Sequence, residues 1–563
     1  MTAAPLASSA SATADWIRCA GCRTLHYAKK MVRCLGVCPD CGHHHRLPAP
    51  DRIAQLVDED SFVPLDVVVS STDVLGFVDS QPYPRRLAKA RAATGLDDAV
   101  LCGTARIGGI AVALAVMDFR FMGGSLGCAV GELITRSAET ALRHRIPLLI
   151  VTASGGARMQ EGVLALMQMA KVSQALATLR DAGLLSISLV TDPTYGGVAA
   201  SFATSCDVVV IEHGARMGFA GPRVIEQTIR QKLPPDFQTA DFLLAHGQVD
   251  AVLHRRDLAG WLGRLLAATR PAQDWTVARR IGTTVRDAGS RERLDPWRTV
   301  SLARDTARPT TTDYLADAFS GFVELHGDRM AADCPSVVAG FATLHRRSVA
   351  VVGHQKGHHT KELVDRNFGM PRPEGYRKAL RVMRLAARLG LPIVSIVDTP
   401  GAYPGRDAEE HGQSVAIAEC VLGMFDLRTP VVTVVSGEGG SGGALALAVA
   451  DRVLMFERAI YSVISPEGCS SILWGDAASS PAAAQALRIT AADLLDLGVV
   501  DGILPEPADP ERMADNLAAA VAEAVADLYT VDRAALVAAR RRRFRAFGLA
   551  AVDLNGVRME EVA

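Results

Sequence analysis

Two stretches of the sequence, LLSISLVTDPTYGGVAASFA (residues 184–203) and TPVVTVVSGEGGSGGALALA (residues 429–448), share one design. In each, a run rich in β-branched residues leads through a polar turn to two glycines, which open a segment of small residues. The glycine pairs are Gly196-Gly197 and Gly442-Gly443, about 246 residues apart. The pattern predicts a strand, a tight turn and a helix in both places, so we expect a duplicated fold.

A second strand-to-glycine turn precedes each glycine pair by about 43 residues. The first is PLLIVTASGGARMQEG at residues 147–162, and the second is PIVSIVDTPGAYPGRDAEE at residues 392–410. Two turns at matched spacing in each half favour duplicated chemistry as well as a duplicated fold.

Such turns can bind anions with backbone atoms alone. The first N–H groups of a helix lack internal partners and carry a partial positive charge, and glycine lets a ligand come close to them. In an enzyme, this arrangement stabilises an enolate or a tetrahedral oxyanion. A single glycine pair is a weak signal, for which tight packing is the alternative explanation, but the matched copies favour function.

The composition limits the class of protein. A chain of 563 residues is too long for one core, and its net charge of −1 gives no overall attraction to nucleic acid or anionic membranes. No apolar stretch is long enough to span a membrane, and the N-terminus lacks the pattern of a secretory signal. We therefore expect a cytoplasmic protein without a membrane partner, whose eleven cysteines are thiols or metal ligands.

Four cysteines near the N-terminus have the spacing of a zinc ribbon. Cys19 and Cys22 form one C-x2-C pair, and Cys38 and Cys41 form another after fifteen intervening residues. Two such pairs hold one tetrahedral zinc ion in a closed, structural site, and unmetallated thiols are the alternative. A ribbon of this kind could touch nucleic acid or cover a substrate entrance, and the sequence does not separate these roles.

Alternating strand-like and helix-like runs predict α/β domains with mostly parallel strands. The arginines of the C-terminal tail, Arg540 to Arg543 and Arg545, are expected on a solvated face, with a role near phosphates as the alternative. The expected order is a disordered leader (1–15), the zinc ribbon (16–46), a first α/β domain (50–265), a linker with a helix near Asp295 to Ala307 (266–310), a second α/β domain (311–530) and a basic helical tail (531–563).

Other catalytic motifs are weak or missing. The G-x-S-x-G string occurs around Ser125 and Ser441, but no histidine follows Ser441 as a hydrolase elbow requires, so only Ser125 stays open as a nucleophile. The sequence has no G-x-x-x-x-G-K-[ST] phosphate loop and no H-E-x-x-H, and the histidines of GHQKGHH (residues 353–359) lack convincing metal spacing. Backbone anion sites with few acid–base side chains suit a reaction whose base comes with a substrate.

The motifs together resemble the carboxyltransferase component of bacterial acetyl-CoA carboxylase, with the zinc-bearing β subunit fused ahead of the α subunit. The β resemblance covers about Trp16 to His254 and rests on the cysteine ribbon, FMGGS, ASGGARMQE, MQMAK, TDPTYGGVAASFA and GFAGPRVIEQTIRQKLPP. The α resemblance covers about Trp297 to Pro507 and rests on RPTTTDY, GHQKG, RNFGMPRPEGYRKALR, DTPGAYPGRDAEEHGQS, GEGGSGGALAL and YSVISPEGCSSILW. It implies an α/β fold of two crotonase-like (ClpP/crotonase superhelix) domains in tandem after the ribbon.

The family reaction moves a carboxyl group from carboxybiotin on a carrier protein to acetyl-CoA, which gives malonyl-CoA for fatty-acid or polyketide synthesis. By this resemblance, Gly196 and Gly197 would hold the thioester enolate, and Gly442 and Gly443 the ureido oxygen of biotin. The residues expected to line the substrate cleft are Gly155, Gly156, Arg158, Gly401, Tyr403, Gly439 and Gly440.

The resemblance also implies cofactors and partners. One structural zinc would be bound, and biotin would arrive on another protein, because the chain has no biotin-attachment motif of the A/V-M-K-M type. The implied partners are the biotin carboxyl carrier protein, biotin carboxylase and a second copy of the chain, in a homodimer equivalent to an α2β2 assembly.

The chain departs from the family pattern close to the glycines. Arg406-Asp407 stands where Val-Gly is frequent, His411 replaces a frequent arginine, Tyr195 stands where Met or Thr is frequent, and the start of the α half is shortened. These changes leave propionyl-CoA or another acyl-CoA as an alternative acceptor. A zinc-ribbon nucleic-acid-binding protein on an inactive crotonase-like body is an alternative of another class, which the balanced charge disfavours.

Overall fold

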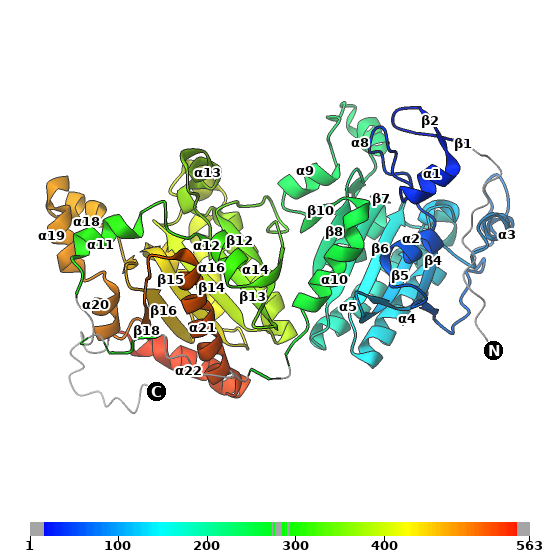
Figure 1. Cartoon of the computed structure of the whole chain (residues 1–563). Helices are drawn as coiled ribbons and strands as arrows, with labels where there is room; N and C mark the ends of the chain where they lie inside the picture. Colours follow the sequence, from blue (N-terminus) through cyan, green and yellow to red (C-terminus); the bar gives the residue numbers. More distant parts are fainter. Residues whose placement is uncertain (1–15, 273, 276–283, 288, 290–292, 549–563) are drawn as a thin grey trace. The chain divides into compact units, whose positions relative to one another are not determined.

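The computed structural model describes residues 16–548, except 273, 276–283, 288 and 290–292. It divides into two compact units, Met1–Ala267 and Ala268–Ala563, which we describe one at a time (Figure 1). The expected leader and parts of the expected linker and tail lie outside the described residues.

The first unit is built on one mixed sheet with the strand order β10-β8-β7-β6-β5-β4-β3, and β9 pairs with β7. Neighbours from β5 to β10 run parallel, whereas β3, β4 and β5 are antiparallel neighbours. A separate two-stranded ribbon, β1 with β2, carries the first cysteine pair between its strands. The strands are β1 Trp16–Arg18, β2 Leu25–Tyr27, β3 Val63–Pro64, β4 Val100–Ile107, β5 Ile110–Met117, β6 Leu148–Ser154, β7 Ser186–Tyr195, β8 Val208–Glu212, β9 Met217–Gly218 and β10 Ala251–Leu253.

Helices pack on this sheet, and α2 and α4 both contact β4 and β5. Because parallel strands of this kind are covered on their faces, their sequences are mostly apolar, and every residue of β6 is buried. The helices are α1 Ala28–Arg33, α2 Ala49–Leu56, α3 Tyr83–Thr94, α4 Cys128–His144, α5 Val163–Asp181, α6 Gly196–Ala199, α7 Phe202–Ser205, α8 Pro222–Ile229, α9 Ala240–Ala245 and α10 Leu258–Ala268, with short 3-10 turns η1 Met122–Gly124, η2 Met159–Glu161 and η3 Arg255–Asp257.

The second unit repeats this design strand for strand. Its sheet has the order β11-β12-β13-β14-β15-β16-β18, and β17 pairs with β15 just as β9 pairs with β7. Neighbours from β13 to β18 run parallel, and β11, β12 and β13 are antiparallel neighbours. The strands are β11 Ser320–Glu324, β12 Val337–Leu344, β13 Arg347–His354, β14 Ile393–Thr399, β15 Val431–Gly440, β16 Arg452–Phe456, β17 Ile460–Ser462 and β18 Gly502–Leu504.

The expected helix near Asp295 is confirmed as α11, where the Asp295 side chain accepts a hydrogen bond from the Arg298 amide. The helices of the second unit are α11 Pro296–Ala303, α12 Thr311–Asp317, α13 Thr360–Asp365, α14 Pro373–Leu389, α15 Arg406–Glu410, α16 Gln413–Met424, α17 Ser441–Leu445, α18 Pro466–Leu473, α19 Ser480–Leu487, α20 Ala491–Asp496, α21 Pro510–Tyr529 and α22 Arg533–Ala546, with 3-10 turns η5 Asn367–Gly369 and η6 Ala477–Ser479.

The basic helix α22 differs from expectation at two arginines. Arg540 is buried, pairs with Asp451 at 2.6 Å and donates to three backbone carbonyls. Arg543 pairs with Asp501 at 2.5 Å. The prediction of a solvated face is therefore wrong for Arg540 and Arg543, because these guanidinium groups find enough acceptors to be taken out of water, whereas Arg541, Arg542 and Arg545 are exposed.

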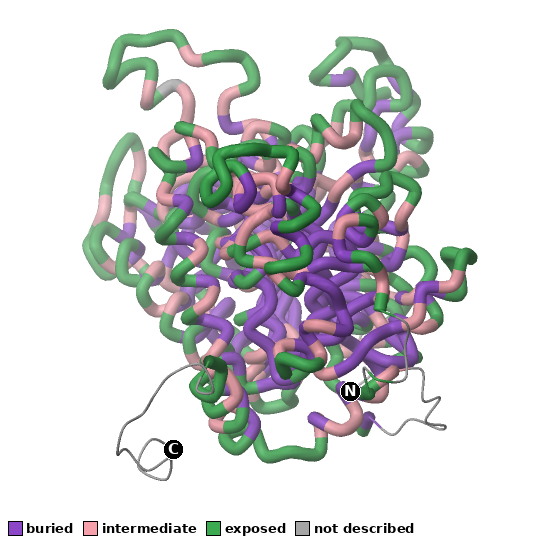
Figure 2. The backbone as a smooth tube through the Cα atoms, turned by 90° about the vertical axis from the view of Figure 1, so that its left-hand side faces the viewer, coloured by how far each residue is buried: buried purple, intermediate pink, exposed green. Residues whose placement is uncertain are grey.

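The duplication predicted from the glycine motifs is confirmed by the two sheets. Figure 2 shows buried residues along the interior strands and exposed residues in the surrounding loops. In the parts of the chain that the structure describes, no helix is long and apolar enough to cross a membrane.

Candidate active site

In the first unit, the two predicted glycine turns meet at the carboxyl ends of β6 and β7. Gly156 (φ 122°) and Gly196 (φ 59°) adopt left-handed backbone conformations that favour glycine. A Cβ on Gly196 would lie 3.2 Å from the Cα of Gly156, so the turns pack backbone to backbone. The Ser154 hydroxyl accepts a 3.0 Å hydrogen bond from the Gly156 amide and fixes the first turn.

The second unit repeats this arrangement at the carboxyl ends of β14 and β15. The Thr399 hydroxyl accepts a 3.1 Å hydrogen bond from the Gly401 amide, as Ser154 does in the first unit. Two glycines now make the close approach: a Cβ on Gly440 would lie 2.1 Å from the Pro400 carbonyl oxygen, and a Cβ on Gly443 would lie 2.4 Å from the amide nitrogen of Ala402. The touching turns are therefore present twice, but different glycines allow the contact in each copy.

Equivalent residues of the two units are one residue closer together in the chain than the alignment of the two glycine pairs predicted. Helix α6 begins at Gly196 and helix α17 begins at Ser441, and both residues have positive φ, 59° and 54°. The structural offset is therefore 245 residues, which pairs Gly197 with Gly442. The sequence comparison aligned the glycine doublets because nothing in the pattern indicates that Ser441 takes a glycine-like conformation.

Two amides on the touching turns of the first unit have no acceptor among the described residues. The Gly196 amide is already used, since it donates to the Phe219 carbonyl at 2.9 Å. The next amide, of Gly197, lies in the first turn of α6, where a helix has no internal acceptor. The amide of Ala157 on the facing turn is also not hydrogen-bonded to a described residue. Two such donors side by side are what an oxyanion hole requires.

The second unit offers the equivalent pair of amides, those of Gly442 and Ala402. Gly442 and Ala402 are partly exposed and face outward, whereas Gly443 is buried. Gly443 therefore gives the two turns the room to touch. Neither Ala157 nor Ala402 was predicted from the sequence as a site residue. The sequence feature that could have indicated them is their position, since each directly follows the glycine of the first turn in its unit.

A cleft of about 550 Å³ opens beside the first glycine turn, a volume typical of small-molecule sites. Three basic side chains stand on its rim. Arg86 pairs with Asp79 and Arg120 with Asp118, whereas the exposed Lys89 forms no ion pair with the described residues. The lining residues are Gln81, Arg86, Lys89, Ala90, Ala93, Arg120, Met122, Gly123, Ser125, Gly155, Gly156, Ala157, Arg158, Met159 and Gln160.

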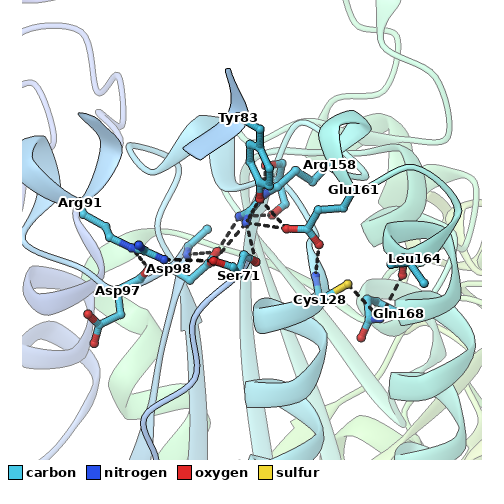
Figure 3. A network of polar contacts seen from close by, with 12 residues as sticks. Ser71, Tyr83, Arg91, Asp97, Asp98, Cys128, Arg158, Glu161, Leu164 and Gln168 are labelled. Atoms are coloured by element: carbon cyan, nitrogen blue, oxygen red, sulfur yellow. Dashed lines mark hydrogen bonds and ion pairs between the residues drawn. The ribbon is translucent and has the colours of Figure 1, made fainter. Parts of the chain in front are cut away.

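Arg158 is fully buried behind the first turn (Figure 3). It forms a 2.6 Å ion pair with Asp98 and donates to the hydroxyls of Ser71 and Ser125 at 3.1 and 3.0 Å. Further contacts go to Tyr83 and Glu161 and to the Ser125 carbonyl, so every N–H group of the guanidinium has a protein acceptor. This arrangement favours a positioning role for Arg158 over the substrate contact expected from the sequence.

Glu161 closes the same network. Its burial would raise its pKa, but hydrogen bonds from the Tyr83 hydroxyl and the Cys128 amide outweigh this and hold the pKa below its ordinary value. Figure 3 shows the Glu161 carboxylate between Arg158 and Cys128 at the start of α4. The carboxylate therefore joins the turn after β6 to the neighbouring helix.

Ser125, which stayed open as a nucleophile, is an acceptor in this network. Its hydroxyl and its carbonyl each accept a 3.0 Å hydrogen bond from Arg158. No base is hydrogen-bonded to the hydroxyl among the described residues, so Ser125 lacks the activation that a serine nucleophile needs.

A buried group of charges lies at the carboxyl ends of the strands in the second unit. The Lys356 Nζ is 2.8 Å from Asp398 and 2.7 Å from Glu438, and Arg304 reaches Glu438 at 2.7 Å. Burial would lower the pKa of Lys356, but the two carboxylates outweigh this and hold the pKa above its ordinary value. This group was not predicted from the sequence, because its residues are distant in the chain and only the ends of parallel strands bring them together.

The remaining predicted site residues lie around the second turn. Gly439 and Gly440 end β15, where they pair with Tyr461 and Ser462 of β17. The Tyr403 amide donates to the Pro371 carbonyl at 3.0 Å, and the Arg372 guanidinium lies 5.0 Å from the centre of the Tyr403 ring. Tyr403 therefore lies on the first turn of this unit, at the position that Arg158 holds in the other.

The four ribbon cysteines come together, with their sulfur atoms within 4.8 Å of one another. Cys19 and Cys41 are 3.6 Å apart, and Cys22 and Cys38 are 3.8 Å apart. A tetrahedral ion with metal–sulfur bonds of about 2.3 Å separates its sulfurs by about 3.8 Å. These are the only side chains in the described part of the chain that meet the geometry of a metal site, and they could hold one ion.

The ribbon is joined to the first sheet by a buried arginine. Arg255 donates to the carbonyls of Leu35 and His45 at 2.7 Å each, and it pairs with Glu212 at the end of β8. Arg52 contacts the other oxygen of Glu212 at 2.5 Å. Burial would raise the pKa of Glu212, but the arginines hold it well below its ordinary value. The carboxylate is therefore a charged partner shared by ribbon and sheet.

A solved structure shares this fold. The chain is similar to a structure titled "Transcarboxylase 12S crystal structure: hexamer assembly and substrate binding to a multienzyme core", with a TM-score of 0.69 and 23% identity over 89% of this chain and 92% of that chain. The likeness defines the protein as an α/β protein of two crotonase-like domains in tandem, which confirms the predicted fold class.

Family models and relatives then identify the chain more closely. The model described as "Carboxyl transferase domain" matches residues 44–233, and "Acetyl co-enzyme A carboxylase carboxyltransferase-like" matches residues 280–548. Proteins of Salinispora arenicola and Salinispora tropica, named acetyl-coenzyme A carboxylase carboxyl transferase subunits beta/alpha, are each 60% identical over 544 and 547 residues, which cover 95% of this chain and 96% of theirs. The chain belongs to this family of fused acetyl-CoA carboxylase carboxyltransferases, as its motifs indicated.

Proposed function

We propose that the chain catalyses the carboxyltransferase step of acetyl-CoA carboxylase, in which a carboxyl group moves from carboxybiotin on a separate carrier protein to acetyl-CoA and gives malonyl-CoA. Membership of the family supports the reaction. The observation that carries the assignment of the site is the pair of touching turns with free amides in each unit. Carboxyl transfer develops negative charge on both reactants, and preorganised amide donors stabilise such charge.

In the first unit, the amides of Gly197 and Ala157 would hold the enolate oxygen of the acyl thioester. Gly196 would act by fixing the turn through its bond to Phe219. The cleft beside the turn would take the rest of acetyl-CoA, and its basic rim would attract the phosphates. Lys89 is the rim residue best suited to this, because its charge is not neutralised by a described carboxylate.

In the second unit, the amides of Gly442 and Ala402 would hold the ureido oxygen of biotin. Gly443 would let the two turns touch, and Gly439 and Gly440 would bring β15 to the site. Near the turns of the second unit, Lys356 pairs with Asp398 and Glu438, so these charges are already engaged with one another, which supports a reaction whose base comes with a substrate. The chain's own groups would then bind, orient and stabilise charge rather than move protons.

We infer that the four cysteines hold zinc. The sulfur separations of 3.6 and 3.8 Å fit a four-thiolate ion, and such a closed site stabilises structure without an open position for substrate. The buried His26 has its Nε2 3.2 Å from the Cys38 sulfur, where it would hydrogen-bond to the thiolate.

The test is a malonyl-CoA decarboxylation assay with free biotin, run beside carboxylation assays with acetyl-CoA and propionyl-CoA. Biotin-dependent turnover with a preference for acetyl-CoA is expected. Gly197→Asp and Gly443→Asp should each abolish turnover while the fold persists, because the first would place a carboxylate at a turn meant for an anion and the second would force the touching turns apart. Normal turnover in both variants, or no biotin-dependent turnover in the wild type, would reject the proposal.

We further propose a homodimer equivalent to an α2β2 assembly, with the biotin carboxyl carrier protein and biotin carboxylase as partners. One chain has a mass of 59.7 kDa, so light scattering should report about twice that value. A monomer at working concentration would contradict this part of the proposal.

A further inference from the structure

A second cavity, of about 320 Å³, lies in the second unit away from the glycine turns. Its walls are the last turn of α14, the end of α16 with the loop that follows it, and the start of α22 (Figure 1). The lining residues are Arg384, Ala387, Arg388, Gly423, Asp426, Leu427, Arg428 and Arg533, and we call this site the arginine cavity.

The arginine cavity lies at the opposite end of the sheet from the proposed site. Helix α14 ends just before β14 begins, so the cavity lies near the amino end of β14, whereas Gly401 follows the carboxyl end of this strand. The seven residues of β14 at about 3.3 Å each give a separation of roughly 20 Å. A ligand in the arginine cavity would therefore not touch the reacting atoms.

The cavity carries an excess of positive charge. Four of its eight lining residues are arginines and one is an acid, Asp426, which is 2.6 Å from Arg541 outside the lining. No carboxylate of the described residues forms an ion pair with Arg384, Arg428 or Arg533. Like charges that share a cavity repel one another, and a bound anion would replace this repulsion with attraction.

A further acid that interacts with Arg428, Asp532, is already engaged. Asp532 is the N-cap of α22, and the amides of Ala535 and Ala534 are the main cause that holds its pKa below the ordinary value, with a smaller contribution from Arg428. Its side chain is therefore committed to the helix start and does not satisfy the arginine donors.

Two glycines leave room for the guanidinium groups. A Cβ on Gly390 would lie 2.9 Å from Nη2 of Arg533, and a Cβ on Gly423 would lie 3.3 Å from Nη2 of Arg384. The rest of the lining is small or aliphatic and has no aromatic ring on which a base could stack. The cavity is therefore suited to recognise charge rather than a base.

We propose that the arginine cavity binds a small molecule with two or more linked phosphates. Arginine recognises phosphate oxygens through paired, charge-assisted hydrogen bonds, and Arg384, Arg428 and Arg533 together can serve more than one phosphate. The volume of about 320 Å³ lies within the range of small-molecule sites and exceeds what a single phosphate fills. Because the arginines would contact the linked phosphates and no other part of the ligand, inorganic tripolyphosphate and ADP are suitable probes.

Isothermal titration calorimetry on the full-length protein at about 0.1 M salt tests the proposal. One site per chain is expected, with affinities for tripolyphosphate and ADP within about threefold of each other and weaker binding at higher salt. Citrate, which carries carboxylates in place of phosphates, should bind at least about tenfold more weakly. Saturating acetyl-CoA should not displace tripolyphosphate, because the cavity is separate from the substrate cleft.

The double variant Arg428→Gln with Arg533→Gln should weaken binding of both probes at least about tenfold. Both side chains are exposed, so the unfolding midpoint should stay at the wild-type value. Arg384→Gln is a second, independent variant with the same expected direction. Arg256→Gln is the matched control, because it removes one charge from a side chain that is 75% exposed in the first unit, and its binding should be unchanged.

Five results would each overturn the proposal. The first is no heat of binding in the wild type up to about 1 mM probe, and the second is unchanged affinity in both the double variant and Arg384→Gln. The third is a loss of affinity in the Arg256→Gln control equal to that in the cavity variants. The last two are displacement of tripolyphosphate by acetyl-CoA and binding of citrate as tight as that of tripolyphosphate.

Discussion

Gly443 provides the sharpest test of the touching turns, through the single methyl group of Gly443→Ala. The new Cβ would lie 2.4 Å from the Ala402 nitrogen and 2.8 Å from the Gly401 carbonyl carbon, whereas ordinary contacts begin at 3.4 Å. Both neighbours are backbone atoms, so the turns must separate by about 1 Å. A displacement of this size costs about 100-fold in rate, or about 2.7 kcal/mol of transition-state stabilisation.

The variant is assayed by biotin-dependent malonyl-CoA decarboxylation and by chemical unfolding. We expect kcat to fall about 100-fold, with a loss of about 1–3 kcal/mol in the free energy of unfolding, because overpacking strains the second unit without preventing its folding. Malonyl-CoA binding should stay near the wild-type value, since the thioester turn belongs to the other compact unit.

The matched control is Gly260→Ala in helix α10. Its new Cβ would meet nothing closer than the Arg264 Nη1 at 3.7 Å, so its turnover should equal that of the wild type, and its stability should be equal or up to about 1 kcal/mol higher. Wild-type turnover and wild-type stability in Gly443→Ala would refute the reasoning, because the turns would then have room that the contact distances deny.

Three further predictions concern the first unit. Cys38→Ser should lower bound zinc well below one ion per chain in elemental analysis, and an unchanged metal content would contradict the four-thiolate site. Arg158→Met should lower the free energy of unfolding by about 3–5 kcal/mol, because it leaves the buried Asp98 without its partner; unchanged stability with a raised KM for malonyl-CoA would instead indicate substrate contact. Since the folded pKa of Glu161 is lowered from 4.5, its contribution to stability is present above about pH 4.5 and is lost as the pH falls through the lowered value. Glu161→Gln should therefore reduce the acid sensitivity of unfolding below about pH 4.5, and an identical pH profile in wild type and variant would count against this.

Local pattern was enough to predict the duplicated sheets. Buried parallel strands such as β6 and β14 are mostly apolar, and the turn after each contains a glycine with a hydroxyl residue two positions before it, so both the strands and the turns can be read from the sequence. The cysteine pairs could be predicted for the same reason, since metal geometry fixes their spacing.

What the sequence could not provide depends on contacts between distant residues or on conformation without a sequence signature. Ser441 adopts a glycine-like φ of 54°, so it is the structural equivalent of Gly196 although its residue type does not indicate this. The Lys356 group needs Asp398 and Glu438, which only the alignment of parallel strand ends brings near. Arg540 lies in a run of arginines that reads as solvated, but free carbonyls at the end of α16 and in the loop after it accept its hydrogen bonds.

The sharing of Arg255 between the ribbon and β8 has a consequence for the supply of active enzyme. If the ribbon loosened for lack of metal, Arg255 would lose two carbonyl acceptors, and a buried cation and carboxylate would be left at the edge of the sheet with fewer partners. Cells starved of the ion are therefore expected to lose whole molecules to unfolding and degradation, so that the capacity to make malonyl-CoA would follow metal nutrition.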